Sequence, residues 1–459
     1  MSDQLRLGTT RGRGAVLAST VASGMAFLDG TVVNVALPHI GADLHADLAG
    51  LQWTVNAYTL ALASLVLLGG ALGDRYGRRR VFLTGVTWFT VASVLCGLSP
   101  GIGVLIAART VQGMGAALLT PSSLALLQSS FVDKDRARAI GAWSGLSGVA
   151  TALGPFVGGW LIDALSWRWI FFMNVPLAVV AVLAALAWVP SGREADRTAP
   201  FDILGAVLGA LGLAGIVYAL IDHGIRAVPA AIVGVLATAA FGVLEHRRGD
   251  RAMLPLTLFT RRQFTVINVV TLFVYAGLGG LTFFLIVELQ VVAGFSALLA
   301  GVSMLPVTLL LLVGSARAGA LSSRIGPRWP LTAGGLIAAG GVLLFQLVGP
   351  HTVYWTHVLP GAILLGTGMT LTVAPLTAAV LAAAPTEQAG SASGVSNAVA
   401  RSGGLLAIAA LPLVVGIAGT QYRQPPALDR AFHAALWCCA GLFVTGAVIA
   451  GLFARRPPS

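Results

Sequence analysis

Charged residues are scarce in this chain of 459 residues. Asp, Glu, Lys and Arg together make up 10% of it, and Lys134 is its only lysine. A water-soluble domain of this size carries about 25% charged residues. Hydrophobic residues make up 57%, and the mean hydropathy is +0.87. This composition excludes an ordinary soluble domain and indicates that the chain is solvated by a lipid bilayer.

The sequence motifs of several enzyme and cofactor classes are also missing. Its three cysteines, Cys96, Cys438 and Cys439, fall in apolar segments and form neither a disulfide framework nor a metal-ligand spacing. No GxxxxGK[ST] motif is present to hold ATP phosphates, and HExxH, CxxC and GxSxG are absent. We therefore expect a protein that is not an enzyme and has no cofactor or metal. Any energy for its work comes from an ion gradient or from the substrate itself.

Apolar segments recur along the whole length of the chain. Each has roughly 20 residues, which is enough to cross a hydrocarbon core about 30 Å thick. We expect an all-α membrane protein with fourteen spans, near residues 15–38, 52–73, 81–99, 102–127, 138–163, 169–189, 202–222, 227–245, 264–288, 298–321, 331–349, 355–381, 392–418 and 432–454.

The positions of the basic residues predict the orientation of these spans. With the N-terminus inside, only four of the 28 Lys and Arg residues fall outside and three lie within spans, so that 21 are cytoplasmic. This asymmetry follows the positive-inside rule and places both termini in the cytoplasm of a cell membrane. The net charge of +11 is thus an orientation signal, and we expect no nucleic-acid partner, since no soluble basic face is present.

A basic hairpin occurs twice. GGALGDRYGRRR from Gly69 returns as GALSSRIGPRWPL from Gly319, and the two copies are 249 residues apart. Such internal duplication is typical of transporters. LTPSSLALLQ from Leu119 and VAPLTAAVLA from Val373 form a second echo. We expect two pseudo-symmetric six-helix bundles, 1–190 and 264–459, with two additional linking helices within 191–263.

Five motifs in order carry a resemblance to a known family. They are LDGTVVNVALP from Leu28, GGALGDRYGRRR from Gly69, RTVQGMGAA from Arg109, GLSGVATALGPFVGGW from Gly145 and SWRWIFFMNVP from Ser166. The chain resembles the major facilitator superfamily, and within it the fourteen-helix drug:proton antiporters. The resemblance implies alternating access, proton coupling and adjoining helices 1 and 4. The glycine-rich motif in helix 5 is associated in this family with exporters.

Asp29 and Arg109 are the leading candidates for proton coupling. At the helical rise, Asp29 lies about 13 Å and Arg109 about 12 Å below the outer boundary of the membrane. A carboxylate at such depth tends to mark an ion or substrate pathway. Burial favours the neutral acid and a neighbouring guanidinium favours the carboxylate, so movement of Arg109 would load and release a proton at Asp29. The alternative is a permanent structural ion pair.

Two further motifs suggest conformational roles. In the resembling family the first hairpin latches the cytoplasmic side, which here implicates Gly70, Asp74, Arg75, Gly77 and Arg78; the alternative is a solvated turn. The second copy has Ser323 in place of the acid, so we expect it to lack an equivalent latch. The small residues of span 5 form either a sliding surface or ordinary tight packing, and they are Gly154, Pro155, Gly158 and Gly159.

Several polar residues within the spans are candidates for lining a substrate cavity. Interhelical hydrogen bonds explain the uncharged ones nearly as well. Arg401 lies about 16 Å into its span, where it faces the cavity, contacts an anionic group or binds carbonyls. We expect Glu288, near the outer end of its span, to be an exposed vestibule carboxylate rather than a coupling site. The complete set is Asn34, Asn56, Tyr58, Gln112, Glu288, Asn397 and Arg401.

The combined prediction is a monomeric secondary transporter that exports amphipathic small molecules in exchange for protons. A nutrient importer on the same fold is the first alternative, and the exporter-associated motif in span 5 argues against it. A membrane scaffold or sensor that transports nothing is the second alternative. The sequence does not identify the substrate.

Overall fold

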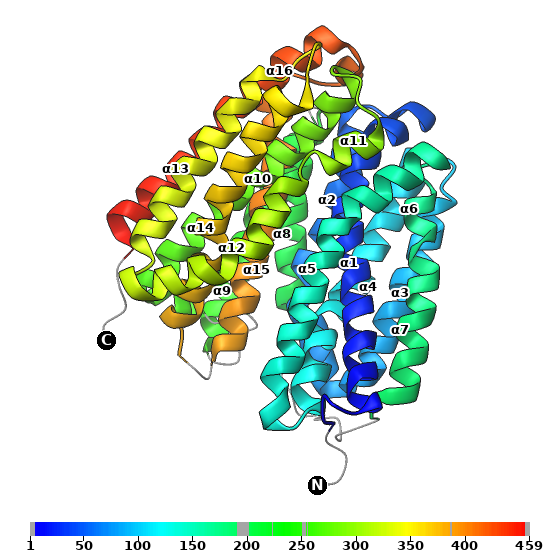
Figure 1. The fold of residues 1–459 in the computed structure, drawn as a ribbon, viewed down its shortest axis with the longest axis vertical. Helices are drawn as coiled ribbons and strands as arrows, with labels where there is room; N and C mark the ends of the chain where they lie inside the picture. The colour runs from blue at the N-terminus through cyan, green and yellow to red at the C-terminus, as the bar shows by residue number, and fades with distance from the viewer. Residues whose placement is uncertain are drawn as a thin grey trace. The chain divides into compact units, whose positions relative to one another are not determined.

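The computed structural model describes residues 5–190, 202–222, 224–249, 254, 256–385 and 388–454. Fourteen helices among them are long and apolar enough to cross a membrane, which confirms the predicted all-α membrane fold (Figure 1). Each predicted span corresponds to one of these helices. The elements are α1 Thr10–Asp43, α2 Leu48–Tyr76, α3 Arg78–Gly97, α4 Ile102–Ser130, α5 Asp133–Ala164, α6 Trp169–Phe172 with α7 Asn174–Trp188, α8 Ile203–Ile221, α9 Ala227–Arg248, α10 Arg262–Val291, α11 Ala297–Val302 with α12 Leu305–Ile325, α13 Arg328–Leu344, α14 Leu359–Ala383, α15 Ala389–Val414 and α16 Pro425–Phe453.

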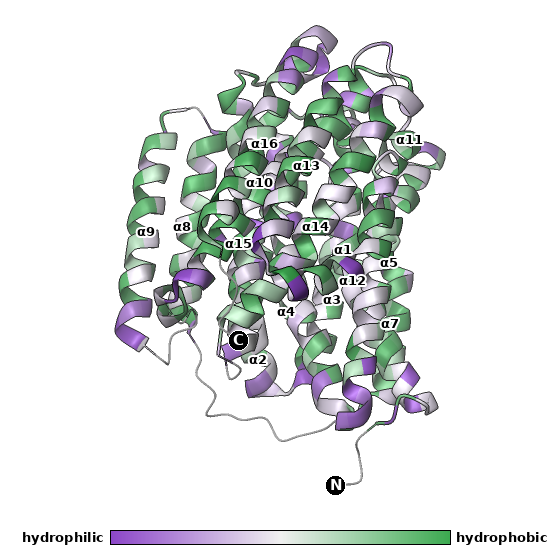
Figure 2. Cartoon of the chain, turned by 60° about the vertical axis from the view of Figure 1, so that its left-hand side comes forward, coloured by the Kyte–Doolittle hydropathy of each residue, from purple (hydrophilic) through white to green (hydrophobic). Residues whose placement is uncertain are grey.

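The outward-facing surfaces of these helices are apolar. Figure 2 shows hydrophobic residues along most of α8 and α9 and hydrophilic residues at the end of α9. Val235 and Leu236 of α9 are 60% and 63% exposed. Large exposed side chains of this kind suit hydrocarbon and not water. The chain is a multi-pass membrane protein.

The chain divides into two compact units. Unit 1 comprises Met1–Ala46 and Trp53–Ala210, and unit 2 comprises Asp47–Gln52 and Leu211–Ser459. In unit 1, α1 packs against α4, α5 and α7, and α3 packs against α4 and α7. In unit 2, α10 packs against α14, α15 and α16, and α13 packs against α14 and α16. A central helix surrounded by several neighbours can carry a buried polar group out of contact with lipid.

The short segment Asp47–Gln52 replaces a missing backbone hydrogen bond of α15 within unit 2. Pro412 lies inside α15 and has no backbone N–H, so the carbonyl of Ile408, four residues earlier, loses its helical partner. The Nε2 of Gln52 donates to Ile408 O at 2.7 Å and to Ala409 O at 3.1 Å, and Gln52 is buried. Gln52 therefore satisfies a carbonyl that the proline leaves open.

The duplicated hairpin is visible in the backbone. The turn between α2 and α3 is Gly77 at φ +96°, and the turn between α12 and α13 begins at Gly326, at φ +87°. A residue with a Cβ atom is strained at such a positive φ, which explains why both copies have glycine there. Pro121 of α4 and Pro375 of α14, from the second sequence echo, both lie inside their helices.

The two linking helices pack on each other through glycines. A Cβ placed on Gly215 of α8 would lie 2.7 Å from Ala230 O and 2.7 Å from Gly234 Cα, both of α9. Such backbone contact is open only to glycine. The α8–α9 pair thus has its own close interface.

Candidate functional site

Asp29 and Arg109 form a buried ion pair in unit 1, as their depths predict. Asp29 lies on α1 and is 0% exposed, and Arg109 lies on α4 and is 1% exposed. The Nη1 of Arg109 donates to Oδ2 of Asp29. The predicted adjacency of helices 1 and 4 is confirmed by the packing of α1 against α4.

Two amides complete the coordination of the Asp29 carboxylate. Gln112, one turn after Arg109, donates from Nε2 to Asp29 Oδ1 at 2.8 Å, and its Oε1 accepts from Arg109 Nη1 at 2.7 Å. Asn174 of α7 donates to the same Oδ1 at 3.5 Å and to Ser93 Oγ of α3 at 2.9 Å. Ser93 in turn donates to Phe171 O at 2.9 Å. The carboxylate therefore sits in a connected network drawn from four spans.

Arg109 has partners besides the carboxylate. Its Nε donates to Thr54 O of α2 at 3.1 Å, and its guanidinium lies 4.3 Å from the ring centre of Tyr58 and 5.8 Å from that of Phe171. Aromatic faces attract a desolvated guanidinium. Tyr58 is held by its own hydroxyl, which donates to Ala26 O at 3.0 Å. The guanidinium consequently keeps three kinds of neighbour if Asp29 loses its charge.

Glycines bring these helices close enough for the network to form. A Cβ on Gly113, beside Gln112, would lie 2.5 Å from Tyr58 O of α2. A Cβ on Gly154 would overlap Thr31, and one on Gly158 would overlap Val32. Thr31 and Val32 belong to the turn of α1 that carries Asp29. The span 5 motif is therefore the surface on which α1 rests, with Gly159 also buried and Pro155 half-buried inside α5.

The network contains two side chains that the sequence analysis did not select. Asn174 is buried and its Oδ1 has no hydrogen-bond partner among the described residues, and Ser93 is buried as well. Asn174 lies within the motif SWRWIFFMNVP, where it is the only amide. That motif offered a signal for Asn174. Ser93 offered none, because serine is frequent in membrane helices.

Hydrogen bonds within the first hairpin and to α4 hold this hairpin in unit 1. Arg78 donates from Nη2 and Nε to Asp74 Oδ1 at 2.8 and 3.1 Å, and from Nη1 to Ala125 O of α4 at 3.1 Å. Both charged side chains are partly exposed, at 35% and 52%. The Arg75 guanidinium lies 5.8 Å from the ring centre of Tyr76. Gly70 allows Pro121 of α4 to approach, since an added Cβ would lie 3.8 Å from its Cβ. These contacts tie the turn to α4.

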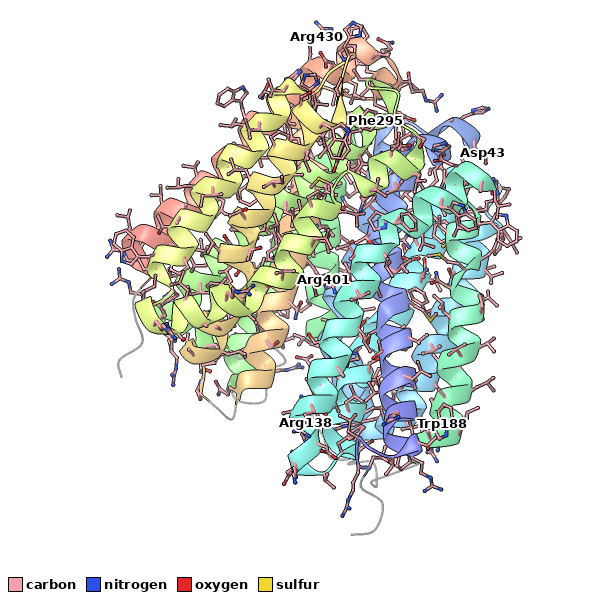
Figure 3. All side chains as sticks on the ribbon, viewed as in Figure 1. Asp43, Arg138, Trp188, Phe295, Arg401 and Arg430 are labelled. Atoms are coloured by element: carbon pink, nitrogen blue, oxygen red, sulfur yellow. The ribbon has the colours of Figure 1, made fainter. Side chains whose placement is uncertain are left out.

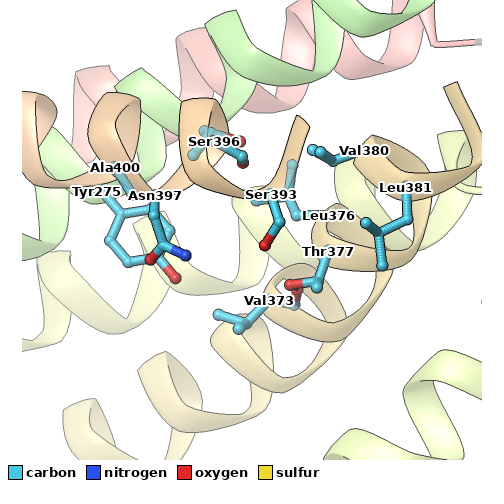
Figure 4. A pocket seen from close by; sticks show the side chains of 11 residues that line it. Tyr275, Val373, Leu376, Thr377, Val380, Leu381, Ser393, Ser396, Asn397 and Ala400 are labelled. Carbon is cyan, nitrogen blue, oxygen red and sulfur yellow. The ribbon is translucent and has the colours of Figure 1, made fainter. Parts of the chain in front are cut away.

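Of the remaining uncharged candidates, Asn34 and Asn56 lie in unit 1 and Asn397 lies in unit 2. Asn34 is half-buried and contacts Gly30 O at 3.5 Å on its own helix, while Asn56 is 0% exposed. Asn397 lines a small cavity of about 80 Å³ in unit 2, between α10, α14 and α15. Figure 4 shows Asn397, Ser396 and Ser393 on one side of that cavity. Arg401 lies one turn further along α15, at mid-height in Figure 3.

The expectation that Glu288 is exposed was wrong. The structure shows it 0% exposed, near the end of α10. The cause is the length of α16, which begins at Pro425 and not near residue 432 as predicted. The additional turns place Asp429 against Glu288.

The arrangement around Asp29 contains one buried carboxylate and one buried guanidinium. The Asp29–Arg109 pair is neutral as it stands, and protonation of the carboxylate would leave one buried positive charge. Thr54 O, Gln112 Oε1 and the Tyr58 ring stabilise that charge. No group of three His, Cys, Asp or Glu side chains that could bind a metal occurs in the described part of the chain.

Comparisons with known proteins agree with this architecture. The puromycin resistance protein pur8 of Streptomyces alboniger is 38% identical over 399 residues, which cover 84% of this chain and 78% of the relative. The tetracenomycin C resistance and export protein of Streptomyces glaucescens is 35% identical over 412 residues, which cover 87% and 75%. The crystal structure of the peptide transporter POT in complex with sulfate matches with a TM-score of 0.70, over 99% of this chain and 98% of that chain; at 16% identity it shows the fold alone.

A family model described as the Major Facilitator Superfamily matches residues 20–408. With a matched region of this extent and relatives above 30% identity, the resemblance carried by the five motifs is confirmed, and the chain belongs to the major facilitator superfamily of membrane transporters.

Proposed function

We propose that this protein exports amphipathic small molecules through the cell membrane in exchange for protons, by alternating access. The observation that carries the proposal is the Asp29 carboxylate, which is 0% exposed and held by Arg109, Gln112 and Asn174. A charged group within a membrane helix is costly and tends to serve a transport pathway.

Proton binding at Asp29 is coupled to the partners of Arg109. When Asp29 is ionised, it shares Arg109 Nη1 with Gln112. When Asp29 takes up a proton, the attraction is lost and Arg109 shifts towards Thr54 O and the Tyr58 ring on α2. Because the pair joins α1 to α4 and Arg109 also contacts α2, this exchange alters contacts among three helices. Such a bistable element is what coupling requires.

The direction of transport is inferred from the relatives and from the α5 motif. One relative is named a puromycin resistance protein, and another is named a tetracenomycin C resistance and export protein. Their identity and coverage support a substrate of the same amphipathic class. No observation on this chain favours the importer, because the likeness to a peptide transporter extends to the fold only.

The first hairpin serves as a conformational latch in this proposal. Asp74 holds Arg78, and Arg78 holds the Ala125 carbonyl of α4, so the turn responds to movement of α4. The positive-inside asymmetry supports cytoplasmic termini in a cell membrane. The transporter acts as a monomer in the lipid bilayer and has protons and its substrate as its other partners.

Transport in proteoliposomes tests the proposal. With an acidic interior, the wild-type chain should accumulate radiolabelled puromycin while a trapped dye reports proton loss from the lumen. Asp29→Asn should abolish the puromycin-driven proton movement. Asp43→Asn is the matched control, because Asp43 lies on the same helix but is 47% exposed, and it should retain coupling.

Other outcomes separate the rival functions. Accumulation accelerated by proton entry together with puromycin would indicate an importer. Absence of proton flux with puromycin and with a panel of neutral, anionic and cationic compounds would indicate a scaffold or sensor. Full coupling in Asp29→Asn would exclude Asp29 as the proton carrier.

A further inference from the structure

A second buried carboxyl lies in unit 2 and has no hydrogen-bond donor. Glu288 of α10 is 0% exposed, and neither Oε1 nor Oε2 has a partner among the described residues. Glu245, which is also 0% exposed, differs in that its Oε2 accepts from Leu254 N at 2.6 Å. A buried carboxylate without any donor is strongly disfavoured. The ionised form of Glu288 therefore lacks the stabilisation that Asp29 and Glu245 have.

The group that faces Glu288 is another acid. Asp429 lies on α16, which packs against α10, and it is the acid next to the Glu288 carboxyl. Asp429 Oδ1 also has no hydrogen-bond donor among the described residues. Two ionised carboxylates are both acceptors, so they cannot bond to each other. One proton between them supplies the missing donor and leaves a single shared negative charge.

The partly exposed side of this pair carries a histidine. His433, one turn after Asp429, has its Nε2 3.5 Å from Asp429 Oδ1, and the two side chains are 30% and 27% exposed. The ring of His433 is fixed by Gln346, whose Oε1 lies 2.8 Å from Nδ1. Arg430 is turned to its own helix, where it donates to Pro426 O at 3.1 Å.

Asp429 is the charged neighbour of the Glu288 carboxyl, and the nearby cationic groups on α16, His433 and Arg430, have the contacts given above. The segment α11, which also packs against α10, has the apolar sequence ALLAGV. A metal is not the ligand that this geometry favours, because the described residues contain no cluster of three suitable side chains. The remaining ligand that two facing carboxyls select is a proton.

We propose that Glu288 and Asp429 together form a second, reversible proton-binding site, in unit 2. Binding forms one O–H bond on either carboxyl and one O–H···O hydrogen bond to the other. Release transfers the proton through Asp429 to His433 or to water and leaves two negative charges. The site differs from Asp29 in its unit, helices and neighbours. The inference stands whether or not Asp29 carries the transported proton.

Infrared spectroscopy of the purified, full-length protein tests this site without requiring a substrate. A protonated carboxyl in an apolar site gives a C=O stretching band apart from those of carboxylates and amides. We expect this band in the wild-type protein and its loss as pH is raised. Glu288→Gln should remove it, and Asp429→Asn should shift its frequency and its titration. Two near-isosteric variants are used so that a folding defect in one does not decide the result.

Glu245→Gln is the matched control, since it removes a buried acid that already has a donor. The band should persist in this variant and in Asp29→Asn. A band that survives both Glu288→Gln and Asp429→Asn would overturn the assignment. A band that depends on Glu288 but stays constant from acidic to alkaline pH would overturn the reversible binding. Neither result bears on puromycin transport, so this inference and the proposed function fail separately.

Discussion

Removing one member of the Asp29–Arg109 pair should destabilise the protein more than removing both. Arg109→Gln leaves Asp29 with two donors among the described residues, the amides of Gln112 and Asn174. Asp29→Asn leaves the guanidinium with Thr54 O, Gln112 Oε1 and aromatic rings. Breaking a buried ion pair by removing one partner costs about 3–5 kcal/mol, because the other charge stays buried. We expect each single variant to fall in that range.

The double variant carries no buried charge at this point. Its loss of stability should therefore be smaller than that of either single variant, so the coupling between the two residues should reach the upper end of the range of about 0.5–3 kcal/mol found for contacting residues. The measurement is equilibrium unfolding in mixed micelles titrated with sodium dodecyl sulfate. The ten tryptophans of the chain provide the fluorescence signal.

The same cycle on Asp43 and Arg168 is the control. Arg168 Nη1 lies 2.5 Å from Asp43 Oδ2, but the two side chains are 33% and 47% exposed. Exposed pairs are worth about 0–1 kcal/mol. Additive losses at Asp29 and Arg109, or a coupling no larger than that of the exposed pair, would refute the reasoning that burial makes this pair interdependent.

Three further perturbations address the packing and the turns. Gly158→Val should destabilise the protein by about 1–3 kcal/mol because the new side chain overlaps Val32, and Val32→Ala should restore part of the loss. Gly148→Val is the control, because an added Cβ there meets nothing within 4 Å and should cause no overpacking. Equal losses in the two glycine variants would contradict the overlap with Val32. Gly77→Ala should cost about 1–3 kcal/mol through backbone strain alone, because nothing lies within 4 Å of an added Cβ; a neutral result in thermal unfolding would show that the turn adapts. Gln52→Leu should cost about 1–3 kcal/mol of stability because it leaves Ile408 O without a donor. This cost should largely disappear in the Pro412→Ala background, where a backbone N–H returns to α15. An unchanged cost would mean that Gln52 does not stabilise the protein through Ile408 O.

Much of the fold was predictable because the bilayer restricts what a chain can do. Each apolar segment must form a helix that satisfies its own backbone, so hydropathy alone predicted all fourteen spans. The depths of Asp29 and Arg109 followed from the helical rise, and their pairing from the implied adjacency of helices 1 and 4.

The missed features depend on helix ends and on rotation about helix axes, which hydropathy does not encode. Exposure of Glu288 is predicted from its position near the outer end of its span, whereas the extension of α16 to Pro425 is not visible in the hydropathy. Gln52 was overlooked because its partner is a carbonyl freed by Pro412, 360 residues later in the chain. Asn174 is the amide of the motif SWRWIFFMNVP, but the motif does not show which way its side chain faces.

The glycine contact between α8 and α9 has an evolutionary consequence. A helical hairpin that closes on itself through Gly215 and Gly234 brings its own interface, so its gain or loss does not require compensating changes in other helices. Two crossings also return the chain to the side of the membrane that it left, so every later segment keeps its topology. An inserted pair is thus tolerated where a single inserted helix would invert everything downstream.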